Sequence, residues 1–169
     1  MAEMTPLEKF KKAVDLVKSK GLDFDVEIPA SSEEIKTLET WAKHDLPPSY
    51  KAALVMLGVP MFEGMHMYGI GKGGVFVEGG SGVWFQTNTV RKEGILSESM
   101  LHIASAGYGP IFALDFDTIG MGGEPVVRLV GLSGYKEDSE IVAQSFGDFF
   151  YDEIKAEIED VLGDDWRQT

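Results

Sequence analysis

The chain has 169 residues, of which 44% are hydrophobic and 25% charged, a size and composition typical of one globular domain spanning residues 1–169. It contains no cysteine, which excludes disulfides, cysteine-ligated zinc or iron–sulfur sites and a cysteine nucleophile. Its 28 acidic and 15 basic residues give a net charge of -13, which disfavours nucleic acid and membranes as partners.

The N-terminal segment predicts an amphipathic helix over residues 5–20. Thr5 is a suitable N-cap, Pro6 suits the first helical position, Glu8 completes a capping box and Gly21 follows the last turn. The lysines here alternate with single apolar residues, so the segment is neither a secretory signal nor a membrane span, and we expect a cytoplasmic protein.

Three further helices are predicted from the same kind of signal. "SSEEIKTLETWAKHDL" has Ser31 and Glu34 spaced as a capping box, and "PPSYKAALVMLG" runs from a proline pair to Gly58. The chain ends with "SFGDFFYDEIKAEIEDVLG", in which Ser145 is the expected cap. Its apolar residues recur at helical spacing before Gly163: Phe146, Phe150, Ile154, Ile158 and Leu162.

Between Met61 and about Val142, glycines separate short β-branched and aromatic runs, which predicts a sheet. The expected strands are "GVFVE", "GVWFQ", "HIASA", "PIFALDF" and "PVVRLVGL". Most connections are too short for crossover helices, so the sheet is expected to be mostly antiparallel. The sequence therefore predicts an α+β fold, with N-terminal helices and a C-terminal helix packed around the sheet, and an edge strand that could pair with a second copy in a homodimer.

Two segments imitate ligand-binding motifs. "GIGKGG" matches a dinucleotide fingerprint at Gly69, Gly71 and Gly74, but "VFVE" follows where a helix is required, which favours a hairpin loop. "DFDTIG" resembles the start of a calcium loop, but positions five and twelve are Ile119 and Val126, which lack side-chain oxygens.

We expect neither a cofactor nor a metal. Asp115 is expected to end a strand and Asp117 to begin a turn. The histidines His44, His66 and His102 have no metal-ligand spacing, and "GGSGV" lacks the final glycine of a nucleophile elbow. An enzyme would need Asp115, Asp117 and His102 to converge in a deep pocket.

The last quarter of the chain is strongly acidic. Residues 137–165 contain eleven acidic residues, and Lys155 is the only basic one. Two interpretations remain open at this point: a solvated helix face that maintains solubility, or a surface that attracts a basic protein.

Four segments between Ser31 and Ile154 resemble one family when taken in order. "SSEEIKTLETWAKHDLPPSYKAALVMLG" resembles its paired opening helices, "HIASAGYGPIFALDFD" its strand–turn–strand unit, "GEPVVRL" its next strand and "SFGDFFYDEI" its closing helix. The chain is thus similar to the SUKH superfamily, which includes fungal cell-wall synthesis regulators and bacterial immunity proteins that neutralise polymorphic toxins. The helix at 5–20 and the glycine-rich section from Gly69 to Gly82 have no counterpart in the resemblance.

The resemblance implies an α+β protein without catalytic apparatus that binds a toxin stoichiometrically, often a nuclease. The glycines of "SAGYGP" then form a tight turn between two strands, and Leu114 packs inward. Because loops at strand ends present residues on a rigid scaffold, the expected partner-binding residues are Trp84, Tyr108, Asp115, Asp117 and Glu124.

Two functions remain open on this basis. The first is an immunity protein whose acidic surface holds a basic toxin domain. The second is a scaffold or regulator of the cell-wall-synthesis type, which has no toxin partner.

Overall fold

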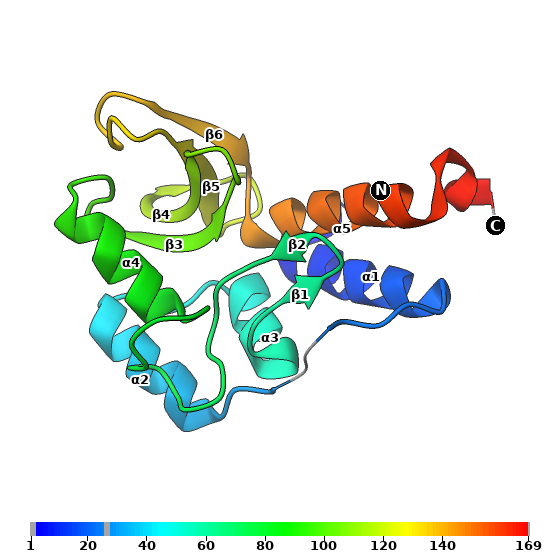
Figure 1. Ribbon diagram of the computed structural model, residues 1–169, viewed down its shortest axis with the longest axis horizontal. Helices are drawn as coiled ribbons and strands as arrows, with labels where there is room; N and C mark the ends of the chain where they lie inside the picture. The colour runs from blue at the N-terminus through cyan, green and yellow to red at the C-terminus, as the bar shows by residue number, and fades with distance from the viewer. Residues whose placement is uncertain (1–2, 26–27, 169) are drawn as a thin grey trace.

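A computed structural model describes residues 3–25 and 28–168; Met1, Ala2, Val26, Glu27 and Thr169 lie outside the described residues. Within that range the chain is an α+β fold, as the sequence predicts (Figure 1). The helices are α1 (Pro6–Ser19), α2 (Ser32–Ala42), α3 (Pro48–Leu57), α4 (Val83–Lys92), α5 (Phe146–Leu162) and the 3-10 helix η1 (Asp164–Gln168). The strands are β1 (Met61–Phe62), β2 (Met65–His66), β3 (Met100–Ser105), β4 (Ile111–Ile119), β5 (Pro125–Val130) and β6 (Ser139–Ala143).

The helix starts predicted from capping residues are confirmed. The Glu8 amide donates to Thr5 Oγ1 and the Glu34 amide to Ser31 Oγ, both at 3.1 Å, and each glutamate accepts in return from its cap. Ser145 Oγ likewise accepts from the Asp148 amide at the start of α5. Local hydrogen bonds at the first turn therefore set where these helices begin.

The main sheet has the order β3-β4-β5-β6 and is antiparallel throughout. The predicted turn between β3 and β4 is confirmed, because the Ala106 amide donates to the Pro110 carbonyl at 3.0 Å. Leu114 is fully buried, as expected. Strands β1 and β2 form a separate two-stranded hairpin beside α5.

Strand β3 is covered on both faces, which explains its nearly continuous apolar sequence. Leu101 and Ile103 pack into the large core with α1, α3 and α5. Met100 belongs to a second, smaller cluster with Val90 of α4. The sheet is therefore fixed between two layers, with α4 against the smaller core.

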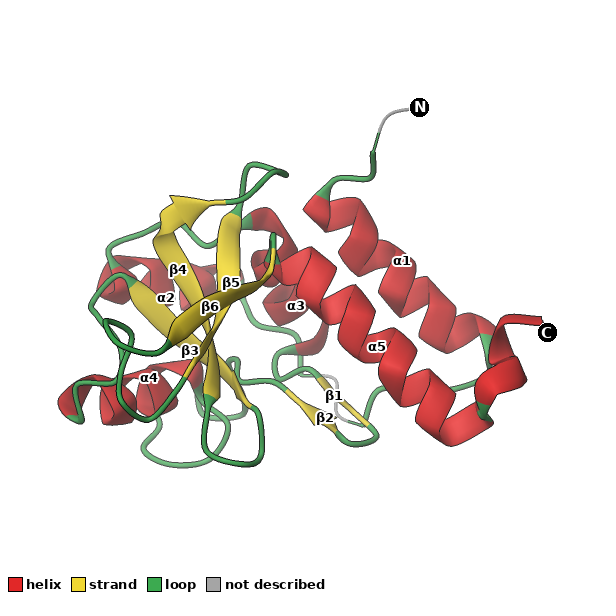
Figure 2. Cartoon of the chain, turned by 90° about the horizontal axis from the view of Figure 1, so that it is seen from above, coloured by secondary structure: helices red, strands yellow, loops and turns green. Residues whose placement is uncertain are grey.

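Helices α1 and α5 lie side by side in both views (Figures 1 and 2). The Phe10 and Phe150 ring centroids are 4.9 Å apart, and Lys9 forms an ion pair with Asp148. The predicted apolar stripe of α5 is buried as far as Ile158. Leu162, which was predicted to continue it, is 42% exposed. None of the helices in the described ranges has the length and apolar content needed to cross a bilayer.

Two predicted strands are wrong. "GVFVE" forms turns, and "GVWFQ" belongs to the junction with α4, which begins at Val83. The aromatic and β-branched residues favour a strand locally, but Val83, Thr87 and Val90 are buried at helical spacing, so packing decides the conformation. "GIGKGG" is consequently a loop leading toward α4 and is not the turn of a hairpin; the helix starts nine residues after Gly74, so the segment remains unlike a dinucleotide site.

Asp115 does not end a strand, and Asp117 does not begin a turn. Strand β4 continues to Ile119 through an irregularity in its pairing with β5 that starts at Asp115. The Asp115 carboxylate holds this irregularity together, because it accepts from the Asp117 amide at 3.0 Å and from Arg128 Nε at 2.8 Å. Asp115 is a structural residue of the sheet.

Glu124 connects the sheet to two helices through buried hydrogen bonds. Its carboxylate accepts from Ser49 Oγ at 2.6 Å and from the Ser49 amide at 3.2 Å, in the first turn of α3. Ser49 Oγ in turn accepts from the Gly147 amide in the first turn of α5 at 3.0 Å. Burial raises the pKa of Glu124, and the bonds from Ser49 partly offset that effect.

We expect Glu124→Ala to lower the free energy of unfolding by about 2–3 kcal/mol, because it leaves the buried Ser49 amide without its acceptor. Glu124→Gln retains one acceptor oxygen and should lose less. Urea unfolding followed by circular dichroism measures both, with the exposed Asp117→Ala as the control, expected within about 0.5 kcal/mol of the wild type. Equal stability of Glu124→Ala and Asp117→Ala would contradict the structural role of Glu124.

His102 is buried in β3, and burial lowers its pKa from 6.5 to about 4. Its ring packs edge-on against Tyr68, with centroids 4.8 Å apart, and within the described ranges neither ring nitrogen has a hydrogen-bond partner of standard geometry. The nearby backbone of Gln86 and Ala104 offsets only part of the effect of burial. His102 is therefore neutral at physiological pH.

Between pH 6.5 and about 4 the unfolded chain binds a proton at His102 that the folded chain does not bind. The stability that depends on neutral His102 is fully present above pH 6.5 and falls as the pH falls through this window. Relative to His102→Phe, the wild type should lose up to about 1.4 kcal/mol of unfolding free energy per pH unit there. Parallel pH profiles of the two proteins in urea unfolding would show that His102 does not titrate in this way.

Candidate functional site

An acidic cleft of about 340 Å³ lies between the β3–β4 turn, the β1–β2 hairpin and α5. Glu153 and Glu157 of α5 form its acidic side. Tyr108 of the β3–β4 turn is far from them in the sequence but lines the same cleft. The half-buried Ala106 and Phe112 contribute to its apolar lining. We call this site the acidic cleft.

Tyr108 is held at the tip of the β3–β4 turn. The residues on either side, Gly107 and Gly109, have φ angles of +90° and +123°, which other residues rarely adopt. The Gly107 amide also donates to Ser105 Oγ at 3.3 Å. The tyrosine is 75% exposed, so its ring is available to a partner.

The two carboxylates of the cleft are one helical turn apart. Glu157 Oε2 accepts from the Gly64 amide at 3.0 Å, which fixes the β1–β2 hairpin against α5. Burial raises the pKa of Glu153, and repulsion from Glu157 and Asp152 raises it further. None of the ion pairs among the described residues involves Glu153 or Glu157.

This arrangement suits a lysine or arginine side chain from another molecule. The aliphatic stem of such a side chain would lie on the apolar lining, and its charged end would relieve the repulsion between Glu153 and Glu157. Tyr108 adds an aromatic face, to which cations are attracted. The cleft therefore has the chemistry of a receptor for a cationic anchor.

The five residues predicted to bind a partner do not lie in one site. Tyr108 lines the acidic cleft, and Asp117 is exposed beside a different depression that also contains Arg128 and Tyr135. Trp84 is half-buried on α4 and packs edge-on against Phe76 at 5.3 Å.

Asp115 and Glu124 are 4% and 5% exposed, and their carboxylates bond to Arg128 and Ser49. In this fold they are not accessible to a partner. Sequence reasoning placed them at strand ends, where exposed loops are common, and had no signal for the residues that pack over them.

Sequence reasoning also missed Glu153 and Glu157 as site residues. They appear in the sequence only as two of the eleven acids of residues 137–165. The available signal was their spacing of four residues beside the apolar stripe of α5, which puts both on one edge of the helix. The lysines of α1 contact α5 nearer its start: Lys9 pairs with Asp148, and Lys12 lies over the ring of Tyr151.

The catalytic arrangement considered from the sequence, Asp115 and Asp117 with His102, is not assembled among the described residues. The depression that contains Asp115 and Asp117 is not lined by His102, which is buried against Tyr68. Ser81 Oγ lies 2.6 Å from His66 Nε2, but among the described residues no carboxylate hydrogen-bonds to the second ring nitrogen of His66. In the same part of the chain, no group of three or more acidic or histidine side chains is placed to hold a metal ion.

The fold and the cleft define an α+β protein with a charged surface site suited to binding another molecule. The chain belongs to the SMI1/KNR4 family (SUKH-1), whose sequence profile matches residues 29–152. The resemblance identified in the sequence is thereby confirmed. No curated protein matches the chain at a significant level.

We expect Glu157→Gln to lower the pKa of Glu153 toward its ordinary value, because it removes the larger of the two carboxylate repulsions on Glu153 while burial is unchanged. Carboxyl-carbon NMR during a pH titration measures this value directly. Asp160→Asn removes the same charge from an exposed position of α5 and serves as the control. A Glu153 pKa that responds equally to both substitutions would contradict the local coupling.

Proposed function

We propose that the chain is a non-catalytic binding protein of the immunity type, which acts in the cytoplasm and neutralises a basic toxin domain by one-to-one binding. The observation that carries the proposal is the acidic cleft, where two carboxylates that form no ion pair with any described residue adjoin an apolar lining and an exposed tyrosine. Membership of the SMI1/KNR4 family (SUKH-1) supports a binding role.

Charge explains how such a protein would select its partner. A net charge of -13 attracts a basic domain from a distance and raises the association rate, while it repels phosphate backbones. Affinity then comes from groups buried at the centre of the contact. In this protein those groups are Tyr108 and the Glu153–Glu157 pair, around which a cationic side chain of the toxin becomes desolvated.

Nuclease toxins fit this chemistry well. Their clefts are lined with lysine and arginine to hold phosphate, and an acidic inhibitor occupies such a cleft in place of the nucleic acid. The alternative function, a regulator without a toxin partner, uses the same fold but does not require a basic ligand.

A pull-down from the native lysate, washed first at low and then at high salt, tests the proposal. We expect a basic protein held one to one and released by salt. The purified partner is then titrated against Glu153→Gln/Glu157→Gln and Tyr108→Ala, each of which should weaken binding about tenfold or more without a change in stability.

The matched control is Asp160→Asn/Asp164→Asn, which removes the same two charges from exposed positions and should stay within about twofold of the wild type. Recovery only of salt-insensitive complexes would favour the regulator. A basic partner whose affinity is indifferent to the cleft variants would place its binding site elsewhere.

A further inference from the structure

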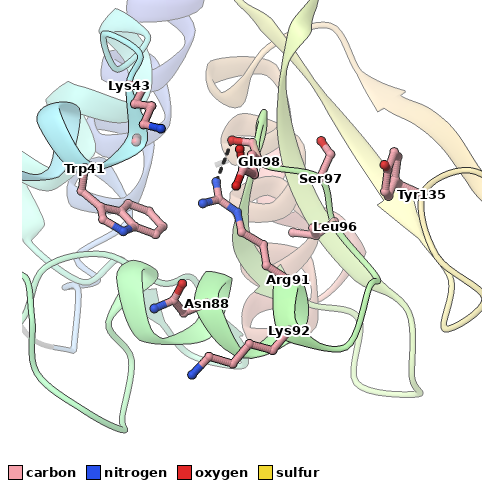
Figure 3. Close-up of a pocket in the computed structure, with 10 residues that line it drawn as sticks. Trp41, Lys43, Asn88, Arg91, Lys92, Leu96, Ser97, Glu98 and Tyr135 are labelled. Carbon is pink, nitrogen blue, oxygen red and sulfur yellow. Dashed lines mark hydrogen bonds between the residues drawn. The ribbon is translucent and has the colours of Figure 1, made fainter.

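A second charged pocket lies at the other end of the molecule from the C-terminal half of α5, between the C-terminal ends of α2 and α4 (Figures 1 and 3). Its volume is about 590 Å³, within the range of ligand sites. Three basic side chains line it in an otherwise acidic protein: Lys43, Arg91 and Lys92. Glu98 is the one acidic residue among the described residues of the lining. We call this site the basic pocket.

Arg91 is at the centre of the basic pocket, and its guanidinium bonds to backbone carbonyls through one nitrogen, Nη2. Its Nη2 donates to the Glu98 and Met100 carbonyls, each at 2.9 Å, and its guanidinium lies 4.7 Å from the ring centre of Trp41. Among the described residues, the buried Nε has no hydrogen-bond partner and no hydrogen bond uses Nη1. Burial lowers the pKa of Arg91, although Glu98 partly opposes that effect.

The positive charge that lines the basic pocket is greater than the negative charge close to it. The C-terminal ends of α2 and α4 each contribute about half a negative charge, and Glu98 contributes one. Against three cations, this leaves about one uncompensated positive charge. None of the ion pairs in the described part of the chain includes Lys43, Arg91 or Lys92. A single carboxylate from outside would complete the balance.

An apolar depression adjoins the basic pocket and shares Trp41 with it. Phe76 lines this depression, is 54% exposed and rests edge-on against Trp84. An exposed phenylalanine supported by a half-buried tryptophan offers a place for one apolar side chain. Trp41 therefore separates a place for an anion from a place for an apolar group.

We infer that the basic pocket and the adjoining depression bind an acidic segment of another protein, in which a carboxylate is next to an aromatic or aliphatic side chain. The carboxylate meets Arg91 Nη1, Lys43 and Lys92 add positive charge on either side of that point (Figure 3), and the apolar side chain packs between Trp41 and Phe76. Charge complementarity selects this occupant, because the site is positive in a protein of net charge -13. The inference is independent of the toxin proposed for the acidic cleft.

A fluorescein-labelled eight-residue peptide with two aspartates beside a phenylalanine is the probe, titrated with the full chain and followed by anisotropy. We expect saturable binding that weakens about tenfold or more when asparagines replace the aspartates, and also when alanine replaces the phenylalanine. Lys43→Gln/Lys92→Gln and Phe76→Ser should cause losses of similar size. Arg91 is left intact, because it also bonds to the backbone.

The matched control is Lys11→Gln/Lys18→Gln, which removes two charges from exposed positions of α1 and should change the affinity less than about twofold. Equal losses in both double variants, equal binding of the asparagine peptide, or no saturable binding would each overturn the inference. Glu153→Gln/Glu157→Gln should leave peptide binding unchanged, so failure of the acidic cleft and failure of the basic pocket are separable outcomes.

Discussion

The arrangement of the molecule depends on one buried carboxylate. Glu124, at the start of β5, accepts two hydrogen bonds from Ser49, whose hydroxyl accepts from Gly147, so the first turns of α3 and α5 meet at this point. The first turn of α1 also packs closely against the first turn of α5, because a Cβ on Gly147 would lie 2.0 Å from the Pro6 carbonyl oxygen. The carboxylate accepts hydrogen bonds from the start of α3, and only glycine at position 147 permits the close approach of α1 to α5. The direction of α5, and with it the acidic cleft, follows from this contact.

The two charged sites result from how the same helices use their side chains. Helix α1 places lysines against the first turns of α5, where Lys9 pairs with Asp148 and Lys12 lies over Tyr151. Further along α5, no lysine in the described part of the chain forms an ion pair with Glu153 or Glu157, so their charge remains available to a ligand. At the other end of the molecule, Lys43, Arg91 and Lys92 lie at the C-termini of α2 and α4. Their positive charge exceeds the negative charge of those helix ends and of Glu98. A partner that uses both sites needs both signs of charge.

The sequence was sufficient where structure is local and insufficient where it depends on packing. Capping boxes at Thr5 and Ser31 predicted helix starts because the bonds join residues three apart. Helix α4 was missed because its Trp and Phe residues favour a strand until burial of Val83, Thr87 and Val90 is known. For the same reason Asp115 and Glu124 were interpreted as exposed binding residues. In the structure Asp115 pairs with Arg128, and Glu124 accepts a hydrogen bond from the buried Ser49 hydroxyl. The exposed turn around Tyr108 was predictable because the glycines that shape it are its neighbours in the sequence; its role in binding stays a prediction.

The boundaries of the family match separate two residues of the acidic cleft from the buried contact at Glu124. The match covers residues 29–152 and therefore includes Ser49, Glu124 and Gly147, which join the sheet to the helices. It excludes α1 and the part of α5 that carries Glu153 and Glu157. Substitutions in the excluded part alter the charge of the acidic cleft but leave the buried contact at Glu124 intact. Under the proposed function, Glu153 and Glu157 could therefore change without disturbing the buried contact at Glu124 that joins the helices to the sheet.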